Sequence, residues 1–527
     1  MPVVNAPSAK RPTIAAIDIG TNSFHLVVAR LAEGPRFDVV TKEKAMVRLG
    51  SGATDMKQLA PEAIERAVST LARYRQIADA NGAVVRAVAT SAMREADNRD
   101  VLLRRARDES GVEIEVISGL EEARLIHLGV LQAVPVFDQR SLVCDIGGGS
   151  TELVVSQSGQ MLAARSLKLG AIRLTNRFFP GERLHPAAVD SCRSFVRSAL
   201  SPFVREAEAH DFDVAVGSSG TVSAIAAMAQ AATGRPAPNT FNNYRFTAAE
   251  LAAVVKTLAE APTVAARRKI AGLDPNRGDI ILAGALILEG VFKALHIDSM
   301  AVSEFALREG VLLDTAQRMA GGSIHHLRDV SRRGVDHLAD MLDEDRDHSR
   351  HVAELALQLF DGTAALHGLD ASTSEYLEAA ALLANVGLYV SHSKHHLHSY
   401  YIIRNSERLT GFTDREIEII AQVARYHRKS APKVNHEEFA RLWPEDQRIV
   451  RVLAGILRVA IGLDRSHQSA VHDIVCRPSA GRLTVEAVHD PGDDISLELY
   501  AANERRSLFE EVLDRQISVI GAPAGAG

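Results

Sequence analysis

The 527-residue sequence has few cysteines, few aromatic residues and no long apolar segment. Its three cysteines, Cys144, Cys192 and Cys476, lie far apart and outside any CxxC pair, which argues against a disulfide framework or a thiolate metal site. The longest strongly apolar run, Ile280–Leu288, ends at Glu289, well short of the roughly 20 residues that span a membrane. The first residues contain no apolar stretch of the secretory type. We therefore expect a cytoplasmic protein without a membrane span.

The sequence also lacks a basic excess. It has 60 Lys and Arg against 66 Asp and Glu, a net charge of −6. General nucleic-acid binding needs a large positive excess, so we expect no nucleic-acid partner. An anionic small substrate stays open, because local basic clusters act within an acidic whole.

The first 60% of the chain alternates short β-branched runs with helical patterns, which is typical of α/β architecture. The expected strands are Ile14–Ile19, Val84–Ala89, Val112–Ile117, Leu142–Ile146 and Val214–Val216, and the expected helices include Pro61–Asn81 and Asp97–Glu109.

Beyond this region the pattern becomes helical. Spacing of three and four residues predicts helices around Val352–Phe360, Ile417–Tyr426 and Ile449–Leu463. Fifteen of the 20 histidines fall between residues 325 and 489, which sets this part apart in composition. Strand-like pieces, Leu483–Ala487 and Ile495–Leu499, then precede a final helix, predicted at Glu504–Leu513. The predicted division is a flexible N-terminus (1–12), two α/β domains (13–137 and 138–320) with a linker at Gly321–Ser323, an all-α domain (325–468), a small α+β domain (469–517) and a disordered tail (518–527).

Two segments of the α/β region resemble each other. In each, a strand ends at an Asp, a turn of small residues follows, and the chain returns as a second strand. Glycines in such turns let backbone N–H groups approach an oxyanion, and hydroxyl groups add donors. The two turns are Gly20-Thr21-Asn22-Ser23 after Asp18, and Gly147-Gly148-Gly149-Ser150-Thr151 after Asp145.

A third loop, Gly217-Ser218-Ser219-Gly220-Thr221, lies between a strand and a helix expected to begin at Val222. The N–H groups at such a helix N-terminus suit a phosphate. Together, the three loops predict a phosphate-binding cleft between two related domains.

The loops in this order are similar to those of the actin-like ATPase superfamily. The detailed segments resemble the exopolyphosphatase/guanosine-pentaphosphate phosphatase family over roughly residues 13–315, and more loosely beyond. These segments are DIGTNSFHLVVARL (18–31), Ser118-Gly119 followed by Glu121–Leu125, CDIGGGSTELVV (144–155), SLKLGAIRLT (166–175), GSSGT (217–221), Arg277–Asp279 and Leu307–Gly310.

The resemblance implies duplicated actin-like ATPase (ribonuclease H-like) domains with an interdomain cleft, followed by an all-α HD-like domain and a small α+β tail. It implies Mg²⁺-dependent, processive hydrolysis of the terminal phosphate of polyphosphate, a homodimer, and a monovalent cation such as K⁺ as a further candidate. Adjacent helical residues point about 100° apart, so only one of Glu121 and Glu122 can face the cleft. By resemblance, Glu122 activates the water, and Glu121 is left as a first-turn acid.

Carboxylates at the strand ends are the metal candidates, because Mg²⁺ takes a few carboxylates plus water and phosphate oxygens. These are Asp145 and Glu152, with Asp18 as a further candidate. Arg94 matches a family position beside the phosphates. The weaker basic candidates are Arg48, Lys168, Arg173 and Arg308.

The C-terminal region resembles the HD-type metal phosphohydrolase fold. Its first and last ligands are represented by His348 or His351 and by Asp464, but Ala384-Asn385 stands where the central His-Asp pair is expected. Neither residue can replace that pair, so we expect no second hydrolase site. A further cluster, His392, His395, His396 and His398, suits either a metal or a polar loop against a polyanion.

Several alternatives stay open at this point. The same loops and Glu122 suit removal of the 5′-terminal phosphate of guanosine pentaphosphate. With 5% aromatic residues and a single tryptophan, Trp443, the sequence shows no pocket in which a nucleobase would stack. This favours polyphosphate over guanosine pentaphosphate as the substrate. A kinase or chaperone ATPase of the same superfold is disfavoured by the Glu121–Arg124 and Arg308–Gly310 segments. A non-catalytic sensor of polyphosphate or alarmone would be marked by tight binding without turnover.

Overall fold

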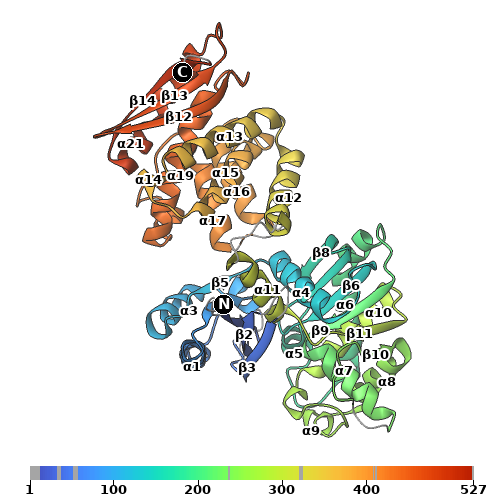
Figure 1. The fold of residues 1–527 in the computed structure, drawn as a ribbon. Coiled ribbons are helices and arrows are strands. Elements are labelled where there is room, and N and C mark those ends of the chain that lie inside the picture. Colours follow the sequence, from blue (N-terminus) through green and yellow to red (C-terminus); the bar gives the residue numbers. More distant parts are fainter. Residues whose placement is uncertain are drawn as a thin grey trace, which may run out of the picture. The chain divides into compact units, whose positions relative to one another are not determined.

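The computed structural model describes residues 12–31, 37–50, 57–234, 238–319, 325–406, 409, 412 and 414–524. The chain divides into two compact units between residues 324 and 325 (Figure 1). The predicted linker Gly321–Ser323 and the predicted flexible terminus up to residue 11 lie outside the described residues. None of the helices in the described part of the chain combines the length and the apolar character needed to cross a membrane.

The first sheet of unit 1 has the strand order β3-β2-β1-β4-β5. Strands β1 (Thr13–Ile19), β2 (Phe24–Leu31) and β3 (Phe37–Ala45) form an antiparallel meander. Strands β4 (Val84–Ala89) and β5 (Ile114–Val116) then add parallel to β1. The expected strand at residues 112–117 is thus shorter than predicted.

The second sheet of unit 1 repeats this arrangement. Its order is β10-β11-β9-β6-β7-β8, in which β6 to β8 form the meander and β9 and β11 add parallel to β6. Strand β10 pairs antiparallel at the edge. The two sheets share one topology, which confirms the duplication predicted from the loops. The bounds are β6 Ser141–Ile146, β7 Thr151–Gln157, β8 Gln160–Leu167, β9 Val214–Ser218, β10 Arg245–Thr247 and β11 Ser299–Val302.

Helices cover both sheets of unit 1. They are α1 Pro61–Ala80, α2 Ser91–Glu95, α3 Arg99–Arg105, α4 Gly119–Ala133, α5 Ala171–Phe178, α6 Pro186–Ala207, α7 Ser219–Ala232, α8 Ala248–Glu260, α9 Val264–Arg267, α10 Ile281–Ala294 and α11 Leu307–Met319, with a π-helical turn at Ala106–Ser110 and a 3₁₀ turn at Pro275–Arg277. The apolar run noted in the sequence becomes α10, which is buried along most of its length. Apolar side chains of α4 and α11 share one core cluster with residues from both sheets, such as Val88 and Val143. These two helices therefore join the halves of the unit.

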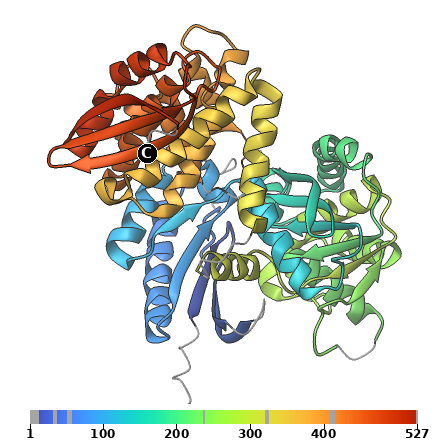
Figure 2. The ribbon, with the colours of Figure 1, turned by 45° about the horizontal axis from the view of Figure 1, so that its top comes forward.

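Unit 2 is mainly helical. Its helices are α12 His325–Leu342, α13 Arg346–Gly362, α14 Ala364–His367, α15 Ser374–Leu383, α16 His395–Asn405, α17 Asp414–Arg425, α18 Glu437–Ala440, α19 Pro444–Leu463, α20 Ser496–Arg505 and α21 Ser507–Leu513, with 3₁₀ turns at Ala371–Thr373 and Val386–Tyr389. Figure 2 shows its three-stranded sheet as the red arrows, in the order β12 (Val471–Ser479), β13 (Arg482–His489) and β14 (Gln516–Pro523). The helices and this sheet share one hydrophobic core.

Two predictions for the C-terminal end are wrong. Residues 518–523, expected in a disordered tail, form most of β14, which pairs parallel with β13 and buries Ile517 and Val519. Residues 495–499, expected as a strand, begin α20, because Glu498, Ala501 and Ala502 are buried at helical spacing. The single helix expected at 504–513 is divided between α20 and α21.

Candidate active site

The first two loops are tight turns closed in the same way. The N–H of Gly20 donates to the carbonyl of Ser23 at 3.2 Å, and the N–H of Gly147 donates to the carbonyl of Ser150 at 3.0 Å. Each turn connects the first two strands of its sheet. The equivalent hydrogen bonds extend the duplication from the topology to the loops.

The two turns also contact each other. A Cβ at Gly149 would lie 2.5 Å from Ser91 Oγ and 2.8 Å from Thr21 Oγ1. Only glycine fits so close an approach. The absence of a side chain at Gly149 therefore lets the first loop pack directly against the second loop.

The third loop is shorter than predicted, because α7 begins at Ser219 and not at Val222. Ser218 ends β9, and its hydroxyl donates to Asp145 Oδ2 at 2.5 Å. The hydroxyl of Ser219 donates to the carbonyl of Ile146 at 2.7 Å. The start of α7 is thus fastened to the end of β6, beside the second loop.

A cavity of about 290 Å³ lies where the three loops meet. The predicted residues among its lining are Asp18, Gly20, Thr21, Asn22, Ser23, Glu122, Asp145, Gly147, Gly148, Gly149, Ser150, Ser219, Gly220 and Thr221. The other predicted site residues are not part of this lining, namely Arg94, Thr151, Glu152, Gly217 and Ser218. Among the described residues that line the cavity, none is Phe, Tyr or Trp.

Three cationic side chains line the cavity: Lys44, Arg277 and Arg308. Arg308 was a weaker candidate, whereas Lys44 was missed and Arg277 was noted only as part of a family segment. His25, opposite Lys44 in the pairing of β2 with β3, lies 3.3 Å from Arg308 through Nδ1 and Nη1. Burial and the Arg308 charge lower the pKa of His25 to about 3, so its ring is neutral at pH 7.

The other three basic candidates are engaged elsewhere. Arg173 donates to the carbonyl of Gly149 at 2.8 Å and pairs with Glu95 at 2.5 Å. Lys168 pairs with the same Glu95 at 3.2 Å and is mostly exposed. Arg48 pairs with Asp279 at 3.5 Å. None of these three basic side chains lines the described cavity.

Four carboxyl groups lie at the loops: Glu122, Asp145 and Glu152 are buried, and Asp18 is partly buried. Burial raises the pKa of both Asp18 and Asp145 to about 7, with Glu122 adding repulsion. Burial also raises the pKa of Glu152 well above its usual value, and Glu122 and Asp145 raise it further. Crowded carboxylates of this kind favour either protons or a bound cation.

The geometry of Asp145 and Glu152 suits a hard divalent cation. They face each other in the antiparallel pairing of β6 with β7, so their side chains share one side of the sheet. Glu152 Oε1 accepts a hydrogen bond from Ser166 Oγ at 2.7 Å, while its buried Oε2 has no hydrogen-bond partner within the described part of the chain. An orphaned carboxylate oxygen beside a second carboxylate fits a magnesium site.

Glu122 lies in the first turn of α4, whose N-cap Ser118 accepts a hydrogen bond from the Glu121 N–H at 3.1 Å. Arg94 Nη1 donates to Glu122 Oε2 at 2.8 Å and to the carbonyl of Ile117 at 3.0 Å. Burial raises the pKa of Glu122, and Arg94 opposes this rise. The structure therefore places Arg94 on the carboxylate of Glu122.

In unit 2, two candidate metal ligands bind each other. His348 Nδ1 lies 2.7 Å from Asp464 Oδ2, and Ala384 and Asn385 end helix α15. The one group of three potential ligands found among the described side chains is elsewhere, at the exposed His472, Asp490 and Asp493. The absence of a second hydrolase site stays a prediction.

Comparison with known proteins identifies relatives along most of the chain. The family model described as the Ppx/GppA phosphatase family matches residues 27–319, and a model for domain III of the same family matches residues 330–501. The guanosine-5′-triphosphate,3′-diphosphate pyrophosphatase of Photobacterium profundum is 30% identical over 84% of this chain and 85% of its own. The protein of the same name from Pseudoalteromonas translucida is 29% identical over 87% of this chain and 88% of its own.

Solved structures resemble more than half of the chain. The crystal structure of an exopolyphosphatase from Cytophaga hutchinsonii is 32% identical and covers 58% of this chain and 98% of its own, with a TM-score of 0.54. An Aquifex aeolicus member of the Ppx/GppA family is 27% identical, with the same coverage and a TM-score of 0.51. These similarities support the predicted duplicated actin-like fold. The chain belongs to the Ppx/GppA phosphatase family, whose members hydrolyse phosphoanhydride bonds.

Proposed function

We propose that the protein is an exopolyphosphatase that releases orthophosphate from the end of inorganic polyphosphate. The observation that carries this proposal is the chemistry of the cavity. It combines three loops of small residues and the cations Lys44, Arg277 and Arg308 with four carboxylates, of which Glu122 is the proposed base. The other three are Asp18, Asp145 and Glu304. The described lining offers donors and positive charge for phosphates, and it contains no Phe, Tyr or Trp; its one aromatic ring is the imidazole of His25, which lies beside Arg308.

In this proposal, Glu122 accepts a proton from the attacking water. Its Oε2 accepts a hydrogen bond from Arg94, and Thr90 is a second side-chain hydrogen-bond partner of this carboxylate, so both fix its orientation toward the water. The water oxygen forms a bond to the terminal phosphorus while the bridging P–O bond breaks, giving orthophosphate and a chain shorter by one residue. A buried carboxylate with a raised pKa is a better base near neutral pH than an exposed one.

Asp145 and Glu152 would hold Mg²⁺, with Asp18 as a further candidate ligand. Bound there, the ion would neutralise charge on the phosphate oxygens. The loop N–H groups and Arg308 would stabilise the remaining charge on the transferred group. A monovalent cation such as K⁺ and a homodimer stay predictions.

The test compares Mg²⁺-dependent phosphate release from long-chain polyphosphate by the wild type and by Glu122→Gln. Loss of a general base lowers the rate by roughly 100-fold or more, while polyphosphate binding persists. The matched control is Glu289→Gln, because Glu289 is a buried acid paired with Arg193 and not part of the cavity lining. A Glu122→Gln variant that keeps the wild-type rate would refute the base assignment.

A second candidate activity is hydrolysis of the 5′-terminal phosphate of guanosine pentaphosphate. The observation that favours it is the name of the two relatives that span most of the chain. The same assay with guanosine pentaphosphate and polyphosphate side by side separates the two, through the ratio of their kcat/KM values. Tight binding of either compound without turnover would make the protein a sensor.

A further inference from the structure

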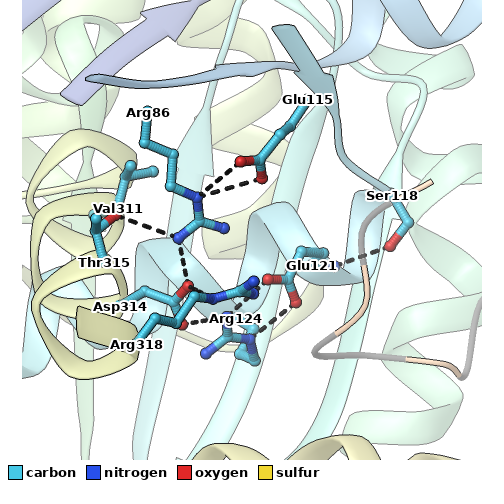
Figure 3. Close-up of polar contacts among 9 residues, drawn as sticks. All are labelled: Arg86, Glu115, Ser118, Glu121, Arg124, Val311, Asp314, Thr315 and Arg318. Carbon is cyan, nitrogen blue, oxygen red and sulfur yellow. Dashed lines mark hydrogen bonds and ion pairs between the residues drawn. The ribbon is translucent and has the colours of Figure 1, made fainter. Parts of the chain in front are cut away.

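A network of buried charges includes Glu121, the residue before Glu122 in helix α4. Figure 3 shows its centre, Asp314 of α11, between Arg124 of α4 and Arg86 of β4. Asp314 Oδ1 accepts from Arg124 Nη2 at 2.7 Å, and Asp314 Oδ2 accepts from Arg86 Nη1. Arg124 donates two hydrogen bonds to the carboxylate of Glu121, at 2.8 and 2.6 Å. Arg86 forms an ion pair with Glu115 at 3.2 Å. The side chains of Asp314 and Glu121 are fully buried.

The network joins the two helices that bring reactive groups to the cavity. Helix α4 carries Glu122, and helix α11 carries Arg308 in its first turn. Glu121 and Glu122 are adjacent, so about 100° of helix rotation separates the network from the cavity. Any shift of Glu121 therefore moves Glu122 with it.

The charges of the network depend on one another. Burial by itself raises the pKa of Asp314, but the guanidinium groups of Arg124 and Arg86 outweigh it and hold that pKa well below its usual range. Buried ion pairs are weak evidence for stability, because desolvation offsets their attraction. Their geometry is nevertheless specific, since the planar guanidinium of Arg124 binds Glu121 through two parallel donors and Asp314 through one of them.

We propose that Asp314 and Arg124 are positioning residues, which act through Glu121 to hold the carboxylate of Glu122 in place relative to Arg308 across the cavity. This inference rests on the proposed function, in which Glu122 is the base. In this proposal Glu121 links the buried network to Glu122, a role that its position in the first turn of the helix did not indicate.

The test measures kcat, KM and the melting temperature for Asp314→Asn and for the milder Arg124→Lys, which keeps the charge but loses the fork. Misplacement of a reacting group by about 1 Å costs up to about 100-fold in rate. We expect kcat to fall by about 10- to 100-fold for Asp314→Asn and by less for Arg124→Lys, with KM within about 3-fold of the wild-type value. Glu289→Gln, which weakens a partly buried ion pair in the second half of the unit, should lower the melting temperature and leave kcat unchanged.

A double-mutant cycle with Glu122→Gln separates positioning from general damage. If the network acts through Glu122, then Asp314→Asn lowers the residual rate of Glu122→Gln by no more than about 3-fold. The inference is overturned if the losses in kcat caused by the two substitutions multiply in the double variant. It is also overturned if Asp314→Asn by itself leaves kcat unchanged. If Asp314→Asn does not fold, the same cycle with Arg124→Lys decides. A Glu122→Gln variant with the wild-type rate refutes the base assignment within the proposed function. Multiplying losses together with a slow Glu122→Gln variant refute only the positioning role, so the two failures are distinguishable.

Discussion

Helices α4 and α11 cross so closely that adding one methyl group, in Gly310→Ala, should force them apart. A Cβ at Gly310 would lie 1.8 Å from the carbonyl oxygen of Leu125, and a Cβ at Gly129 would lie 2.2 Å from that of Ala306. Both obstacles are backbone atoms, which no side-chain rotation relieves. In Gly310→Ala, the helices must separate by roughly 1.6 Å to restore an ordinary contact of 3.4 Å.

Two effects follow from this separation. Overpacking of a close contact costs about 1–3 kcal/mol, which corresponds to a melting temperature lower by about 1–5 °C for a unit of this size. The same movement displaces Glu122 from Arg308, so kcat falls by about 10- to 100-fold. Thermal melting followed by circular dichroism, together with steady-state phosphate release, measures both.

Gly181→Ala is the matched control. A Cβ at Gly181 meets no atom within 4 Å, and its backbone is outside the left-handed region. We expect this variant to melt and react as the wild type does. If Gly310→Ala does the same, the two helices do not cross at these glycines and the reasoning is wrong.

Three further predictions concern the cavity. Arg94→Met removes the positive charge that lowers the pKa of Glu122, so this pKa rises and the acid limb of the kcat/KM profile moves to higher pH. An unmoved acid limb would contradict the pairing of Arg94 with Glu122. Chelation of divalent cations abolishes activity, and Asp145→Asn raises the Mg²⁺ concentration needed for half-maximal rate by about 10-fold or more, measured by Mg²⁺ titration. Arg277→Ala raises the KM for polyphosphate by about 10-fold and makes it less sensitive to salt, whereas an unchanged KM would place the substrate elsewhere.

Much of unit 1 could be predicted because its signals are local. Each strand that enters one of the first two phosphate loops is a continuous apolar run that ends at an Asp, and the turn that follows needs small residues within four or five positions. The return of Glu152 opposite Asp145 follows from the same hairpin register. The expectation that only one of two adjacent glutamates faces the cavity came from helix geometry alone.

The C-terminal sheet shows where such reasoning ends. Strand β14 pairs parallel with β13, and two helices lie between them in the chain. Nothing within residues 516–523 reveals that partner, and the sequence at 521–527, which is rich in Gly and Ala, resembles a tail. For the same reason, the start of α20 resembles a strand, since Ile495 and Leu499 fit either pattern when seen without their neighbours.

By itself, the sequence determined the duplicated loops, the strands that lead into them, and the identity of the carboxylates at the ends of those strands. The tertiary structure alone decided which charges meet. It places Arg94 on Glu122, brings Lys44 and Arg277 to the cavity, and joins Arg124 to Asp314 across 190 positions of the chain. The physical reason is that hairpins and helix faces are set by neighbours in sequence, whereas contacts such as Arg94–Glu122 and Arg124–Asp314 form only where distant elements pack together.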